Sequence, residues 1–142
     1  MFLLDTGPVV AFFDPDDAEH ARVSKFMVKL VKSSGQFVTT SAVIAEAMYF
    51  LQAVNGGPAR FVQFLGFTQT RVLDFSSTTD LQRAVELMTR YADTPMDFAD
   101  ATLILAAEKV RTNRICTIDL RGFTVFRTIS GRPFNLDLEN EA

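Results

Sequence analysis

Short apolar runs alternate with helical segments along almost the whole chain, and this alternation strongly limits the possible folds. Runs typical of buried strands are found at 2–5, 36–40, 71–75, 114–119 and 124–129. Segments with helical spacing or helix-start residues separate most of them, at 7–13, 17–32, 41–53, 58–66, 78–93 and 97–110. Because strands that alternate with helices build βαβ units, the pattern predicts an α/β fold with a mostly parallel sheet covered on both faces.

The size and composition of the chain fit one globular domain. It has 142 residues, of which 48% are apolar and 14 are Phe, so it is not a disordered chain. A domain of this length buries roughly 68–70% of its unfolded surface and needs no metal or disulfide to hold a core. We place the domain at residues 1–130 and expect 131–142 to be a polar tail that frays or docks on a partner.

Cysteine usage and the N-terminus favour an intracellular protein. Cys116 is the only cysteine, so it cannot form an internal disulfide, and we expect it to be a small buried apolar residue. This favours a reducing, cytoplasmic setting. The apolar N-terminus lacks the basic residues of a signal peptide and is interrupted by Asp5. No uncharged run reaches about 18 residues, so no membrane span is expected.

Two predicted strands end in carboxylates. Asp5 closes the first strand, and Asp119 closes the strand at 114–119. Parallel sheets bind ligands outside the carboxyl ends of their strands, so both side chains are expected at one crevice. Thr6 and Thr117 lie near these acids in sequence. Their hydroxyls either orient a carboxylate or a metal-bound water, or bond the local backbone at the strand end.

Glu46 is the only charged residue of the segment SAVIAEAMYFL, 41–51. The remaining residues from Ala42 to Leu51 are apolar or aromatic, which predicts a helix buried on all sides. A buried Glu is costly unless it is paired or binds a metal, and no Lys or Arg lies within one turn. We therefore expect Glu46 to belong to a site. The alternative is a single solvent-facing Glu on a short helix.

Asp97 and Asp100 lie at the start of an alanine-rich apolar segment, TPMDFADATLILAAEK, 94–109. One interpretation is that they cap the helix and occupy its first turn, where Asp is favoured. The other is that both face the crevice, because residues three apart share a helix face. Asp100 is the less suitable cap, since alanines flank it. The helix N-terminus itself would favour anionic groups, including a phosphate.

A cation would allow so many carboxylates to gather, because they repel one another otherwise. Oxygen ligands select Mg²⁺ or Mn²⁺, whereas one His and one Cys cannot build a usual zinc centre. We expect His20 to be a solvated surface residue. No G-x-S-x-G elbow supports a Ser-His-Asp triad, and no glycine-rich motif supports a nucleotide cofactor.

The charge balance does not decide whether the chain binds nucleic acid. The net charge of −3 argues mildly against it. If the five candidate acids are committed to a cation, however, the rest of the chain has fewer acids than its 14 Lys and Arg. Arg121, next to the Asp119 loop, is a candidate phosphate contact, and the alternative is an ordinary exposed Arg.

Four segments in order, FLLDTG, SAVIAEAMYFL, MDFADATLILAAE and ICTIDLRGF, carry a family resemblance. Over residues 2 to about 127 the chain resembles the PIN-domain ribonucleases, and among them the VapC toxins of prokaryotic toxin–antitoxin pairs. The resemblance implies a three-layer α/β/α domain with a short, mostly parallel five-stranded sheet. It also implies a Mg²⁺- or Mn²⁺-dependent endoribonuclease, with RNA as substrate and an antitoxin as a possible partner.

The resemblance also assigns roles to the acids. It puts the four acids of the family at Asp5, Glu46, Asp100 and Asp119. The three aspartates would be direct or water-mediated metal ligands, and Glu46 would bind metal or position the attacking water. Asp97 matches a position that is often acidic.

Two further features concern the family resemblance and partner binding. Thr117 matches a Ser/Thr position near the fourth acid of the family. The Phe-rich stretch at 56–67 is expected to be core, and an exposed part of it would form a homodimer face or receive an antitoxin segment. The residues after about 130 have no clear counterpart in the family.

Two rival classes remain. A phosphatase of the haloacid dehalogenase type needs a second Asp two residues after the first, where this chain has Gly7. A solitary PIN-like nuclease, or a catalytically silent module that acts by binding a protein, is compatible with the sequence.

Overall fold

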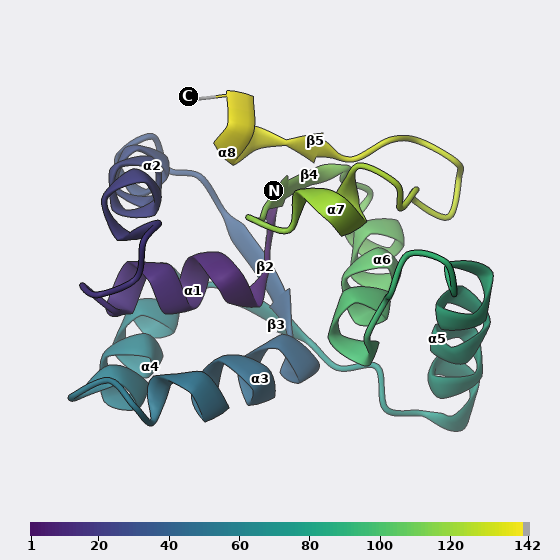
Figure 1. The fold of residues 1–142 in the computed structure, drawn as a ribbon, viewed down its shortest axis with the longest axis horizontal. Helices are drawn as coiled ribbons and strands as arrows, with labels where there is room; N and C mark the ends of the chain where they lie inside the picture. Colours follow the sequence, from purple (N-terminus) through teal and green to yellow (C-terminus); the bar gives the residue numbers. More distant parts are fainter. Residues whose placement is uncertain (141–142) are drawn as a thin grey trace.

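A five-stranded parallel sheet lies at the centre of the computed structural model, which describes residues 1–140 (Figure 1). The strands are β1 (Phe2–Leu4), β2 (Phe37–Thr40), β3 (Arg71–Leu73), β4 (Arg114–Cys116) and β5 (Asn135–Leu136). Their order is β3-β2-β1-β4-β5, and every neighbouring pair is parallel. The prediction of a parallel α/β fold is therefore confirmed.

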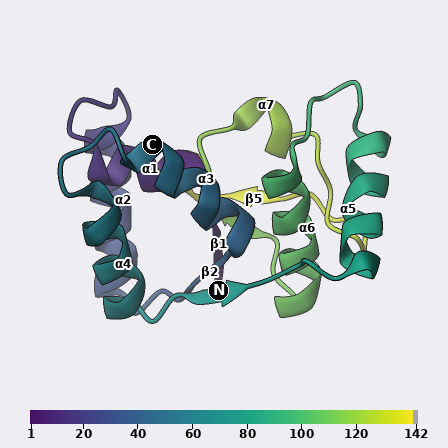
Figure 2. The same cartoon turned by 90° about the horizontal axis from the view of Figure 1, so that it is seen from below.

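Helices cover both faces of the sheet. They are α1 (Thr6–Phe13), α2 (His20–Lys32), α3 (Ser41–Leu51), α4 (Gly57–Phe67), α5 (Thr78–Arg90), α6 (Phe98–Val110), α7 (Leu120–Phe123) and α8 (Asp137–Asn140). In Figures 1 and 2, α1, α2 and α4 lie on one side of the sheet and α5 and α6 on the other. Within residues 1–140, no helix is long and apolar enough to cross a bilayer.

The strands divide the core into two clusters. Leu3 packs into the cluster that includes α5 and α6, whereas its neighbours Phe2 and Leu4 pack into the cluster that includes α1, α2 and α4. This alternation follows from the strand period of two residues. Because both faces are covered, all three residues are buried, and the predicted three-layer arrangement is confirmed.

The predicted strand at 124–129 is wrong. This segment follows α7 as a turn, in which the Phe126 N–H donates to the Gly122 carbonyl at 2.9 Å. The Phe126 ring is buried edge-on against Phe123 and Tyr91, so its apolar character reflects core packing. The fifth strand, β5, lies instead in the segment that we expected to be a tail, and it pairs with β4.

The C-terminal segment is docked on the domain as far as residue 140. Leu138 of α8 is only 1% exposed. Arg114 forms an ion pair with Asp137 at 2.6 Å, and Arg22 forms one with Glu139 at 2.8 Å. The expectation of a fraying tail is therefore wrong for these residues. Glu141 and Ala142, the end of the predicted tail, lie outside the described residues.

The structure also tests the expectations for Cys116, His20 and the helix at 41–51. Cys116 is buried, as predicted. His20 is not simply solvated, because it opens α2 and its Nδ1 lies 2.7 Å from the Ala11 carbonyl oxygen. The helix at 41–51 is not buried on all sides, since Tyr49 is 71% exposed and Phe50 is 50% exposed. An apolar sequence therefore does not imply burial on every face here.

A carboxylate-lined candidate active site

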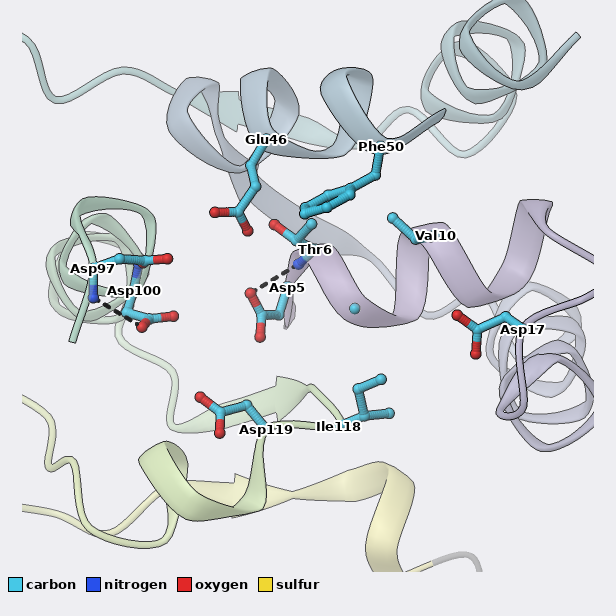
Figure 3. A pocket seen from close by; sticks show the side chains of 11 residues that line it. Asp5, Thr6, Val10, Asp17, Glu46, Phe50, Asp97, Asp100, Ile118 and Asp119 are labelled. Carbon is cyan, nitrogen blue, oxygen red and sulfur yellow. Dashed lines mark hydrogen bonds between the residues drawn. The ribbon is translucent and has the colours of Figure 1, made fainter. Parts of the chain in front are cut away.

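All five predicted acids line one pocket of about 390 Å³ at the edge of the sheet where β1 and β4 end, together with a sixth carboxylate, Asp17 (Figure 3). The predicted acids are Asp5, Glu46, Asp97, Asp100 and Asp119. Four separate parts of the chain supply them, and their convergence is the arrangement that the strand-end argument predicted.

Asp5 is the most deeply placed of these acids, with 7% of its surface exposed. It ends β1 and caps α1, where its Oδ1 accepts a hydrogen bond from the Thr6 N–H at 2.8 Å. Its Oδ2 accepts one from the Thr117 hydroxyl at 2.7 Å. Burial raises the pKa of Asp5 to about 6, although both hydrogen bonds lower it and the charges of Asp119 and Glu46 raise it slightly.

Thr117 connects two of the acids. Its hydroxyl donates to Asp5 and accepts from the Asp119 N–H at 3.0 Å, so it orients a carboxylate and also bonds the local backbone. Asp119 in turn caps α7, where its Oδ1 accepts from the Gly122 N–H at 3.1 Å. The β4–α7 turn therefore holds Asp119 at a fixed position beside Asp5.

Thr6 leaves a polar atom free at the pocket. Its Oγ1 is buried and completes no hydrogen bond with the described residues at ordinary distance and angle. Figure 3 shows this side chain beside the Glu46 carboxylate. Burial raises the pKa of Glu46, the nearby Thr6 hydroxyl lowers it, and the charge of Asp97 raises it.

Asp97 and Asp100 cap α6 and also line the pocket. The Asp97 Oδ1 accepts from the Asp100 N–H at 2.8 Å, and the Asp100 Oδ2 accepts from the Asp97 N–H at 3.2 Å. This reciprocal pair is a capping box. Burial, followed by the charges of Asp5 and Asp97, raises the pKa of Asp100 to about 8. Asp97 and Asp100 therefore cap the helix and also face the crevice, so both interpretations of the sequence apply.

The donor set of the pocket suits a hard divalent cation. It offers only oxygen, from carboxylates and from the unpaired Thr6 hydroxyl. Burial and the neighbouring negative charges raise the pKa of Asp5 and of Asp100, and a bound cation would offset both effects. Among residues 1–140, no three His, Cys, Asp or Glu side chains are gathered as a ready-made ion cage. Mg²⁺ needs none, because it keeps several waters and binds proteins through one or two carboxylates.

The pocket also contains residues that the sequence reasoning did not assign to it. They are Gly7, Val10, Asp17, Phe50 and Ile118. Phe50 follows Glu46 by four residues, a spacing that already puts both on one helix face. Arg121 is exposed on α7 and does not line the pocket.

Comparisons with known proteins agree with this geometry. The family model described as PIN domain matches residues 2–127. Ribonuclease VapC26 of Mycobacterium tuberculosis (strain ATCC 25618 / H37Rv) is 26% identical over 136 residues, which cover 94% of this chain and 98% of that protein. The crystal structure of Mycobacterium tuberculosis VapC20, described as a sarcin-ricin loop cleaving toxin, matches with a TM-score of 0.72. The two sequences are 19% identical, and the match covers 91% of this chain and 98% of the VapC20 chain.

Proposed function

This chain belongs to the PIN domain family, and from that premise we propose that it is a metal-dependent endoribonuclease and the toxin of a toxin–antitoxin pair. The observation that carries the proposal is the pocket in which all five predicted carboxylates converge. The similarity to a protein named as a ribonuclease, over nearly the whole length of both chains, supports the same activity. The similarity to VapC proteins supports the toxin assignment, and the free, buried Cys116 supports a cytoplasmic location.

Asp5, Asp100 and Asp119 are the proposed ligands of one or two Mg²⁺ or Mn²⁺ ions, directly or through water. When bound, such an ion supplies a water of lowered pKa and stabilises negative charge on the scissile phosphate and the leaving oxygen. Glu46 would bind the metal or position the attacking water. The resulting reaction is the hydrolysis of an RNA phosphodiester bond.

The surrounding residues hold these acids in place. The Thr6 N–H and the Thr117 hydroxyl each bond one oxygen of Asp5, so its carboxylate cannot rotate freely. Asp97 fixes Asp100 through the capping box, which gives it a positioning role. Helices α1 and α6 also begin at this pocket, and their N-termini favour a phosphate there.

The exposed part of α4 is the proposed partner-binding face. Phe67 of α4 is 79% exposed although Phe61 of the same helix is buried, which supports a homodimer or antitoxin face on this helix. Light scattering of the isolated chain measures the self-association. Arg121 would contact the RNA backbone outside the pocket, and its replacement should reduce the salt dependence of RNA binding.

The activity test compares the wild type with Asp5→Asn and Asp100→Asn. We expect the wild type to cleave RNA with Mg²⁺ or Mn²⁺, to lose activity with a chelator, and to lose it in both variants. Unchanged cleavage in both variants would contradict the proposal. A catalytically silent PIN module would bind Mn²⁺, seen as a raised melting temperature, without cleaving RNA. An adjacent reading frame for a short partner would distinguish a toxin from a solitary nuclease.

A further inference from the structure

The pocket has an apolar part beside its carboxylates. Val10, Phe50 and Ile118 line it together with the backbone of Gly7. In Figure 3, Phe50 from α3 and Ile118 from the segment after β4 lie on opposite sides of α1, which carries Val10. Asp17, from the turn before α2, lines the end of the pocket beyond Val10 in this view.

We propose that this apolar part is a slot for one unstacked base of single-stranded RNA, with Phe50 as its stacking platform and Asp17 as an acceptor at the base edge. The inference rests on the proposed function and adds the part of the substrate that the carboxylates do not bind. Sequence-tolerant binding of single strands relies on bases that stack on aromatic side chains.

Phe50 has the exposure and the position that this role requires. Half of its surface is open to solvent, and its ring contacts the still more exposed Tyr49 edge-on, at 5.5 Å between centroids. It lies one helical turn after Glu46 on the same face of α3. The Cβ atoms of Glu46 and Phe50 are therefore roughly 5–6 Å apart, so that a base on the ring and its neighbouring phosphate can be bound together.

On the other side of the slot, Ile118 packs tightly against α1. A Cβ atom on residue 7 would lie 2.6 Å from Ile118 Cγ1, so Ile118 packs directly against the α1 backbone. Gly7 is thus needed for close approach of the β4–α7 turn to α1.

Asp17 gives the slot a polar end. Its Oδ1 accepts from the Glu19 N–H at 2.8 Å, and its Oδ2 makes no hydrogen bond with residues 1–140. A carboxylate oxygen accepts from the exocyclic amino groups of guanine, adenine and cytosine, whereas uracil has no amino group and offers only its N3–H between two carbonyl oxygens. A ring that is apolar on its faces and polar at its edge matches this slot better than an aliphatic side chain does.

A fluorescence experiment tests the slot without depending on cleavage. The chain has no Trp, so Phe50→Trp introduces a single indole reporter. Guanosine and adenosine 5′-monophosphate, added with Mg²⁺, should quench this fluorescence, and ribose 5-phosphate should not. Val85→Trp is the matched control, because Val85 is 59% exposed on α5 and does not line the pocket. Its fluorescence should not respond to nucleotides.

Steady-state kinetics then measure how much Phe50 and Asp17 contribute to RNA binding. Phe50→Ala should raise the KM for single-stranded RNA by about 5-fold to about 100-fold, with a smaller change in kcat and an unchanged melting temperature. Phe50→Tyr should restore the KM. Asp17→Asn should weaken discrimination against uracil at the position next to the cut.

The outcomes separate the slot from the activity. An RNA-cleaving wild type with the same KM in Phe50→Ala, and no quenching in Phe50→Trp, overturns the slot and leaves the nuclease assignment intact. Quenching by nucleotides in a chain that cleaves no RNA supports the slot and removes the proposed activity.

Discussion

Replacing Asp5 by Asn should stabilise the metal-free protein at neutral and alkaline pH. Burial raises the pKa of Asp5 from 3.8 to about 6 in the folded protein. Each unit of pKa shift corresponds to 1.36 kcal/mol, so the charged form of Asp5 costs the fold about 3 kcal/mol. This is a large part of a domain stability of roughly 5–15 kcal/mol.

The direction of the pH dependence of stability follows from how many protons Asp5 binds in the folded and in the unfolded protein. Because the folded pKa is the higher one, the folded protein keeps its proton between about pH 4 and pH 6, where the unfolded chain has lost it. Wild-type stability is therefore favoured below about pH 4 and is lost as the pH rises through 6. Asn does not ionise. The stability of Asp5→Asn relative to the wild type should therefore grow from about pH 4 to about pH 6 and stay constant above about pH 7.

The assay is urea unfolding followed by circular dichroism from pH 4.5 to 8.5, with a chelator present. Asn keeps an oxygen for the Thr6 N–H but cannot accept from the Thr117 hydroxyl as the carboxylate does. Thr117→Val is therefore the control, since it removes that hydrogen bond without removing the charge. An Asp5→Asn protein that is no more stable than the wild type above pH 7 would refute the reasoning. Mn²⁺ should then stabilise the wild type more than Asp5→Asn.

Three further predictions concern other parts of the domain. Asp100→Asn should abolish metal-dependent RNA cleavage and Asp97→Asn should only weaken it; equal losses in initial-rate assays would contradict that ranking. Leu138→Ala should lower the free energy of unfolding by about 2–5 kcal/mol in urea titrations, because Leu138 is buried although it lies near the C-terminus; a loss below 1 kcal/mol would indicate that α8 contributes little. Gly7→Ala should lower the melting temperature and RNA cleavage together, because its Cβ would overlap Ile118; a variant with normal stability and activity would mean that the Ile118 side chain moves aside readily.

The sequence predicted the elements that have a clear period or a clear end. The first strand and the α6 segment are long or strongly apolar, and the predicted strand ends were sufficient to place Asp5 and Asp119 at one crevice, although β4 ends at Cys116, three residues before Asp119. The order of the strands in the sheet confirms this argument, since β1 and β4 are neighbours.

The remaining elements could not be read from the sequence for physical reasons. A two-residue strand such as β5 has no period, and the apolar run at 124–129 resembles a strand although Phe126 packs into the core from a turn. The exposure of Phe50 was missed because burial of a helix face depends on what packs against it. No partner in the described chain covers that side of α3 completely.

The hydrogen bond between Thr117 and Asp5 joins residues that are 112 positions apart. Closing so long a loop is entropically costly and comes late relative to local helix formation. The acids of the pocket therefore come together only when β4 docks beside β1, one of the longest-range pairings of the sheet. A partly folded chain with its helices formed would have no assembled pocket, so the first appearance of RNA cleavage during refolding would mark the docking of β4.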